Sequence, residues 1–167
     1  MLRYDSVEEL VQAAEKRKTN ISDIVLEDQA QEMDRSVDDI YEQMENNAKV
    51  MREAIDGALQ PNIKSASGLS GGDAYKLHRA IEQGKSLGGG LMDKVLVKAL
   101  AIAESNACMG RIVAAPTAGS CGILPAVLLT FQEEKNVSQT KMVMSLFTAA
   151  AIGMVIAKRA SISGAEG

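Results

Sequence analysis

Apolar residues recur at intervals of three and four along most of the chain, which is the spacing of one face of an α-helix. The pattern is clearest between residues 36 and 59, where it comprises Val37, Ile40, Tyr41, Met44, Met51, Ile55 and Leu59. Similar patterns predict helices over residues 6–18, 22–33, 73–83, 91–107 and 138–159, and one more that begins near Cys121. No stretch alternates apolar and polar residues as a half-buried strand would. The sequence therefore predicts an all-α fold with glycine-rich loops between helices.

Residues at the ends of the predicted helices support these boundaries. Ser6 and Glu9 have the spacing of a capping box, in which each side chain can bond the backbone of the other residue. Pro61 should end the helix that precedes it. Pro125 is expected within or just beyond the first turn of the helix that begins near Cys121, because the early amides of a helix need no intrahelical partner.

The composition suits a helical protein with one main core. Of the 167 residues, 46% are hydrophobic but only 3% are aromatic, and there are nine methionines and no tryptophan. The core must therefore consist of aliphatic side chains and methionine, which pack well between helices. We expect an N-terminal helical segment over residues 1–60 that packs on a core formed by residues 61–167.

Charge and cysteine content argue against several classes of protein. A net charge of −4, without a basic stripe, argues against nucleic-acid binding. Two cysteines and no signal peptide suggest a reducing, cytoplasmic setting rather than a disulfide framework. Residues 142–157 are nearly uncharged, but they are fewer than the roughly 20 residues that a membrane span needs, and many are small. We therefore expect a central helix of a soluble core, and no membrane partner.

A segment of small residues, glycine and proline joins two apolar runs between residues 114 and 125. Pro116 lacks an amide donor and favours an extended conformation at Ala115. Cys121 lies where the next helix would start. Backbone amides at a helix start favour negative charge, so a thiolate there would be a competent metal ligand. The alternative is a tight turn between helices with a buried, inert cysteine.

A second loop, over residues 65–73, consists mainly of serine and glycine and precedes the helix predicted over residues 73–83. Free amides at that helix start would favour an anion. The loop lacks the Lys-Ser/Thr ending of a P-loop and no strand precedes it, so a substrate carboxylate is a better candidate than a nucleotide phosphate. The alternative is a flexible linker.

Four stretches of the sequence resemble the α chain of the iron–sulfur-dependent L-serine dehydratases. They are residues 67–77 (SGLSGGDAYKL), 106–110 (NACMG), 115–128 (APTAGSCGILPAVL) and 163–167 (SGAEG). The most specific parts are the segment around Cys121 and its order relative to the serine–glycine loop. The resemblance covers essentially the whole chain. It implies that residues 61–167 form a partial catalytic domain that is truncated at its C-terminus.

The resemblance also implies a cofactor. The family binds a [4Fe–4S] cluster through three cysteines, and Cys121 matches the first ligand position. The family's next ligands follow a segment like residues 163–167, so they would lie beyond Gly167. Cys108 matches no ligand position and is expected to be structural. Because a stable cluster needs several thiolates in fixed geometry, we expect this chain alone to be without a cluster and inactive. Pyridoxal phosphate is not expected.

The reaction that the resemblance implies converts L-serine to pyruvate and ammonia, with a Lewis-acidic iron bound to the substrate hydroxyl. The residues expected to hold the substrate carboxylate offer hydroxyl or amide donors, and they are Ser67, Ser70, Gly71 and Gly72. Asn106 and Thr117 could orient the substrate or order the cluster loop. Lys76 and His78 are the titratable candidates for a catalytic role near the loop, although each is also explained as a residue of the helix surface.

The expected partners are the substrate L-serine and the β chain of the same enzyme, whose serine–histidine–threonine motif is absent here. Self-association could cover apolar surface left by a missing C-terminal part. Two alternatives stay open. One is a related iron–sulfur lyase that acts on another small amino acid, such as L-cysteine, and the other is a helical interaction domain without catalysis.

Overall fold

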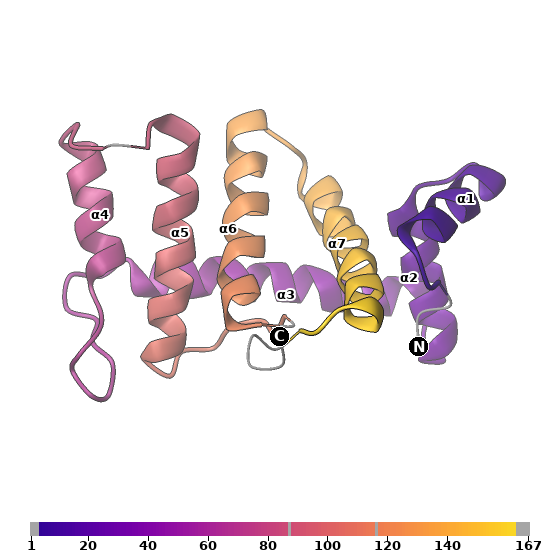
Figure 1. Ribbon diagram of the computed structural model, residues 1–167, viewed down its shortest axis with the longest axis horizontal. Coiled ribbons are helices and arrows are strands. Elements are labelled where there is room, and N and C mark those ends of the chain that lie inside the picture. The colour runs from indigo at the N-terminus through magenta and orange to yellow at the C-terminus, as the bar shows by residue number, and fades with distance from the viewer. Residues whose placement is uncertain (1–3, 87, 116, 163–167) are drawn as a thin grey trace. The chain divides into compact units, whose positions relative to one another are not determined.

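The computed structural model describes residues 4–86, 88–115 and 117–162, and these residues form helices and loops without a strand (Figure 1). This confirms the predicted all-α fold. The helices in these ranges are α1 (Val7–Arg17), α2 (Ile21–Glu32), α3 (Val37–Ala58), α4 (Asp73–Glu82), α5 (Gly90–Ala107), α6 (Ala118–Lys135) and α7 (Gln139–Arg159). Pro116 and the motif over residues 163–167 lie outside the described residues, and the extended conformation expected at Ala115 stays a prediction.

The chain divides into two compact units. One comprises Met1–Asn46 and Ser138–Gly167, and the other comprises Asn47–Val137. This division differs from the expected parts over residues 1–60 and 61–167, because α7 packs against α2 near the other end of the sequence. Periodicity identifies each helix, but it does not reveal which helix the apolar face will meet.

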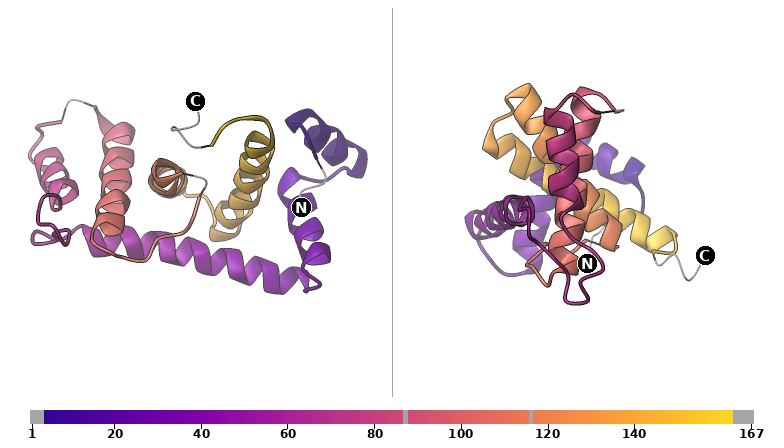
Figure 2. Two further views of the ribbon diagram at one scale, coloured as in Figure 1. Left: turned by 60° about the horizontal axis from the view of Figure 1, so that its bottom comes forward. Right: turned by 90° about the vertical axis from the view of Figure 1, so that its left-hand side faces the viewer.

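In the first unit, capping residues set the helix starts. The amide of Glu9 donates to Ser6 Oγ at 3.1 Å at the start of α1, as the capping box predicts. The turn after α1 brings α2 beside it (Figure 2). In α7, Val143 and Phe147 are fully buried. Lys158, near the end of α7, donates to Asp5 Oδ1 at 2.7 Å, so this helix end is bonded to the segment that precedes α1.

Helix α7 is the one helix in the described part of the chain that is long and apolar enough to cross a membrane. Only length and composition support such a span, and the core helix of a soluble protein has the same properties. One third of its most apolar window is buried. The expectation of a soluble core helix over residues 142–157 therefore stays a prediction.

In the second unit, α4, α5 and α6 stand side by side and run alternately in opposite directions (Figure 1). Two ion pairs join α5 to α6: Lys94 with Glu134, and Lys98 with Glu133 at 2.8 Å. The two helices approach closely at Gly122, where an added Cβ atom would lie 3.2 Å from the carbonyl oxygen of Ala99. A small residue is therefore needed directly after Cys121.

The start of α6 differs from the sequence prediction. The helix begins at Ala118, three residues before Cys121, because the side chain of Thr117 caps it by accepting the amide of Ser120 at 3.1 Å. Pro125 consequently lies inside α6 rather than in its first turn. Since proline has no amide hydrogen, the carbonyl of Cys121 receives no helical hydrogen bond from residue 125.

Candidate functional site

The serine–glycine loop, residues 65–72, closes on itself before α4. The amide of Ser65 donates to the carbonyl of Ser70, and the amide of Gly68 donates to the carbonyl of Ser65, both at 2.9 Å. The hydroxyls of Ser65 and Ser67 lie 3.2 Å apart. Ser67 and Ser70 are exposed. The loop extends beyond the N-terminal end of α4 (Figures 1 and 2). Its exposed residues Ser67 and Ser70 present hydroxyl groups to solvent.

Two glycines form the turn that leads from this loop into α4. Gly71 and Gly72 have φ angles of +128° and +83°, which favour glycine. An added Cβ atom at Gly71 would overlap the carbonyl oxygen of Ile63 and lie 2.8 Å from the Cα atom of Lys64. The backbone before the loop and the backbone after it are therefore in direct contact, and no larger residue fits at Gly71.

A buried carboxylate from α5 caps the start of α4. The N-cap residue of α4 is Gly72, which has no side chain to accept the first amides. Instead, Glu104 Oε1 accepts the amide of Asp73 at 2.6 Å and the amide of Ala74 at 3.3 Å. Glu104 is only 7% exposed. Its second oxygen, Oε2, is also buried and has no hydrogen-bond partner among the described residues. The helix-start amides expected to be free for an anion are thus held by this chain's own carboxylate.

The two titratable candidates lie on α4, close to its start. Lys76 Nζ bonds Asp73 Oδ1 at 2.9 Å. This hydrogen bond and the charge of Asp73 raise the pKa of Lys76 above its usual value, and the charge of Glu104 adds to the effect. Lys76 is therefore a stable cation at neutral pH rather than a ready proton acceptor. His78 Nε2 lies 3.6 Å from Glu82 Oε1 on the same helix. A catalytic role for either residue stays a prediction.

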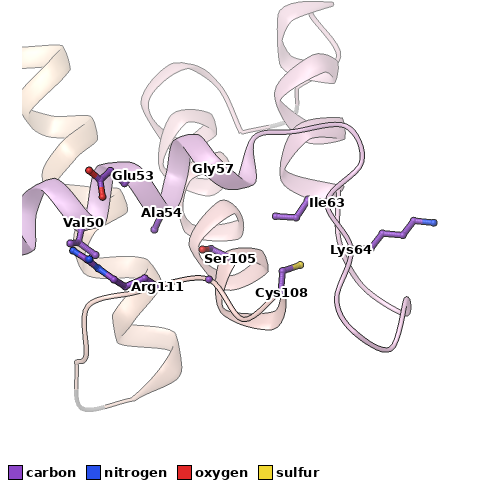
Figure 3. A pocket seen from close by; sticks show the side chains of 10 residues that line it. Val50, Glu53, Ala54, Gly57, Ile63, Lys64, Ser105, Cys108 and Arg111 are labelled. Carbon is purple, nitrogen blue, oxygen red and sulfur yellow. The ribbon is translucent and has the colours of Figure 1, made fainter.

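An open cavity of about 570 Å³ lies beside the end of α5 (Figure 3). It is lined by residues from α3, from the backbone before the serine–glycine loop and from the segment after α5. In Figure 3, Ser105 and Cys108 are seen between Ile63 and Arg111, and the side chain of Lys64 points away from them. Asn106 follows Ser105 in the sequence and is exposed. The segment around Asn106 therefore lies near Ile63 and Lys64, which precede the serine–glycine loop, because residues of both segments line this cavity.

The predicted metal ligand lies in the first turn of α6. Cys121 is 9% exposed, and its Sγ atom accepts the amide of Ala115 at 3.1 Å. The hydroxyls of Thr117, the N-cap residue, and Ser120, directly before Cys121, bond each other at 2.6 Å. Thr117 thus caps the helix start that carries Cys121, and its hydroxyl oxygen is hydrogen-bonded to Ser120.

The described residues do not by themselves make a cluster site. Among residues 4–86, 88–115 and 117–162, no group of three or more His, Cys, Asp or Glu side chains is placed to hold a metal ion. Cys121 supplies one thiol, whose sulfur is already bonded to the backbone. A [4Fe–4S] cluster needs further thiolates, so this set does not fit one without additional ligands.

The predicted site residues fall into two local groups. Packing of α4 on α5 brings the serine–glycine loop and Lys76 to the turn that carries Glu104 and Asn106. Thr117 and Cys121 form the second group, at the start of α6. Sequence reasoning missed Glu104. A signal was available, because Glu104 follows Val97 and Ala101 at intervals of four and three, on the buried stripe of α5. A charged residue at such a position requires a polar partner.

The fold and the site define a helical protein in which exposed hydroxyl groups and one buried carboxylate, bonded to backbone amides, lie at the start of α4. A family model described as "Serine dehydratase alpha chain" matches residues 16–167, and the chain belongs to this family. The resemblance of the sequence motifs to the α chain of L-serine dehydratases is thereby confirmed.

Individual relatives agree with this assignment. A probable L-serine dehydratase, alpha chain, from Bacillus subtilis (strain 168) is 41% identical over 98% of this chain and 54% of its own length. The L-serine dehydratase, alpha chain, of Peptoniphilus asaccharolyticus is 32% identical over 98% of this chain and 56% of its own length. An L-serine dehydratase of Helicobacter pylori (strain ATCC 700392 / 26695) is 33% identical, with 36% of its length covered. The chain thus spans about half the length of the two alpha chains. No solved structure matches it.

Proposed function

We propose that this chain contributes the α-chain part of an L-serine dehydratase, which converts L-serine to pyruvate and ammonia. The observation that carries the proposal is the family match over residues 16–167, since the segments that build the site lie within it. The relatives' names specify serine, and we therefore favour serine over L-cysteine as substrate.

The reaction removes water from the substrate. The Cα proton and the Cβ hydroxide leave, and the resulting 2-aminoacrylate becomes an imine that water hydrolyses to pyruvate and ammonia. In this chain, the hydroxyls of Ser67 and Ser70 are exposed donors suited to a carboxylate. Lys76 adds a stable positive charge beside the same loop, because Asp73 raises its pKa. We assign Lys76 to substrate attraction rather than to proton abstraction.

The proposal extends to a [4Fe–4S] cluster and a β chain in the complete cytoplasmic enzyme. Cys121 would be one thiolate ligand, presented by the first turn of α6 and oriented by the amide of Ala115. The remaining ligands would have to come from elsewhere in the complete enzyme, because the described residues do not supply them. We expect this chain alone to be inactive.

Anaerobic iron–sulfur reconstitution tests the proposal. It would use this chain, and this chain complemented with the part of the Bacillus subtilis relative that the match does not cover. Visible absorption reports the cluster, and pyruvate formation from L-serine with the β chain present reports activity. We expect only the complemented form to show cluster absorption and pyruvate formation. Cys121→Ala should abolish the cluster absorption, whereas the matched variant Cys108→Ala should retain it.

The same experiment can reject the proposal. If the complemented form takes up no iron, or if Cys121→Ala behaves like Cys108→Ala, Cys121 is an inert buried cysteine. The buried sulfur and its hydrogen bond to Ala115 would then be structural. A helical interaction domain without catalysis would become the better interpretation.

A further inference from the structure

Glu104 has a property that its capping role does not explain. One oxygen, Oε1, holds the amides of Asp73 and Ala74, while the equally buried Oε2 has no hydrogen-bond partner among the described residues. A buried carboxylate oxygen without a donor lowers stability, because the group has lost its hydration. A neutral glutamine would cap α4 through the same kind of oxygen at a lower desolvation cost. The negative charge therefore requires a separate explanation.

The cation closest in sequence to the capped amides does not neutralise that charge by a direct bond. Lys76 lies one turn into α4, but its Nζ atom bonds Asp73 Oδ1 at 2.9 Å. The charge of Glu104 nevertheless contributes to the raised pKa of Lys76, so the two groups interact through space. The start of α4 thus carries a buried carboxylate, one oxygen of which has no hydrogen-bond partner among the described residues, and an exposed cation beside the same loop.

We propose that Oε2 of Glu104 binds the α-ammonium group of the amino-acid substrate, while the serine–glycine loop and Lys76 receive its carboxylate. An α-amino acid is a zwitterion, and the start of α4 offers a group of opposite charge for each end. The proposal rests on the proposed function. Since Oε2 is shielded from solvent, the ammonium group reaches it when neighbouring backbone yields. In this proposal the movement falls to the exposed serine–glycine loop, which leads directly into the amides that Glu104 caps.

Calorimetric titration of the whole 167-residue chain tests the inference with two probes. L-serine carries the ammonium group, and 3-hydroxypropanoate has the same carboxylate and hydroxyl but no ammonium group. Glu104→Gln should weaken the binding of L-serine about tenfold or more, which is the effect of losing a hydrogen bond to a charged group. Binding of 3-hydroxypropanoate should be unchanged. Glu82→Gln makes the same charge change at the other end of α4 and should affect neither probe.

Thermal melting separates binding from folding. Glu104→Gln should melt at the wild-type temperature or above it, because the cap remains and the buried charge is gone. The inference is overturned if Glu104→Gln binds L-serine as the wild type does, if it weakens both probes alike, or if the wild type binds neither. If L-serine binding depends on Glu104 but the complemented enzyme forms no pyruvate, the inference stands and the proposed function fails.

Discussion

At Gly71 the backbone leaves no room for a side chain. The residue has a φ angle of +128°, and an added Cβ atom would overlap the carbonyl oxygen of Ile63. We expect Gly71→Ala to lower the free energy of unfolding by about 2–4 kcal/mol, from backbone strain and steric overlap together. Chemical denaturation monitored by circular dichroism measures this change.

Gly57 provides the matched control for Gly71. It lies in α3, and an added Cβ atom there would meet nothing within 4 Å. Because alanine favours the helix, Gly57→Ala should raise the free energy of unfolding by roughly 0.5–1 kcal/mol. Equal effects of the two substitutions would show that the serine–glycine loop is not held in the described conformation.

The two cysteines differ in environment and should differ in reactivity. Cys108 is half-buried beside the cavity at the end of α5, whereas Cys121 is buried and its sulfur is bonded to Ala115. A thiol reagent such as 5,5′-dithiobis(2-nitrobenzoate) should therefore modify Cys108 several-fold faster in the folded chain. Cys108→Ser should remove the fast phase, and denaturant should make Cys121 reactive. A fast phase that survives in Cys108→Ser would contradict the buried position of Cys121.

At the scale of elements, most helices could be predicted because their signals are local. Ser6, Pro61 and the apolar spacing of α3 act over a few residues, and α1 and α3 lie within one or two residues of the expected ends. The predicted start of α6 near Cys121 is wrong, because serine, threonine and glycine before Cys121 suggest a loop, whereas the cap at Thr117 allows the helix to begin earlier. The cap of α4 depends on Glu104, which lies 31 residues from Asp73 in the sequence. The spacing of residues within a helix does not predict a contact over that distance.

The ion pair between Lys94 and Glu134 joins α5 to α6 and gives stability a defined pH dependence. Its hydrogen bond lowers the pKa of Glu134 and raises the pKa of Lys94. Glu134 thus contributes above its unfolded pKa of about 4.3 and loses this contribution as pH falls. Lys94 contributes below about pH 10.4 and loses its contribution as pH rises through the folded pKa.

Lys94→Gln should therefore lower the melting temperature slightly at pH 7, and the difference from the wild type should shrink as pH falls below 4. It should also shrink in high salt, because the pair is exposed. Thermal melts at pH 7 and pH 3 measure this effect, with Lys85→Gln as a control for the same change of charge. A deficit of equal size at both pH values would indicate lost packing of the lysine stem instead.

At the scale of the whole molecule, the greater length of the relatives suggests what could cover an exposed apolar surface of this chain. The chain covers 54% and 56% of the two alpha chains to which it is compared. On α6, Ile123, Val127 and Phe131 recur at intervals of four and are 58%, 44% and 52% exposed. Such a stripe on one face of a helix is typical of a surface that another segment or subunit covers. Sequence reasoning expected exposed apolar surface, but not its position on α6.

We expect this chain to bind a hydrophobic dye such as 8-anilinonaphthalene-1-sulfonate or to self-associate, because the stripe on α6 is exposed in the described part of the chain. Replacing Ile123, Val127 and Phe131 together by glutamine should lower both signals several-fold and leave the helical circular dichroism spectrum unchanged, since exposed positions contribute little to packing. Replacing the exposed residues Val7, Val11 and Met33 of the first unit is the matched control. A monodisperse wild-type monomer that does not bind the dye would show that this stripe is not a binding face. Dye binding that the control set removes equally well would place the apolar surface in the first unit rather than on α6.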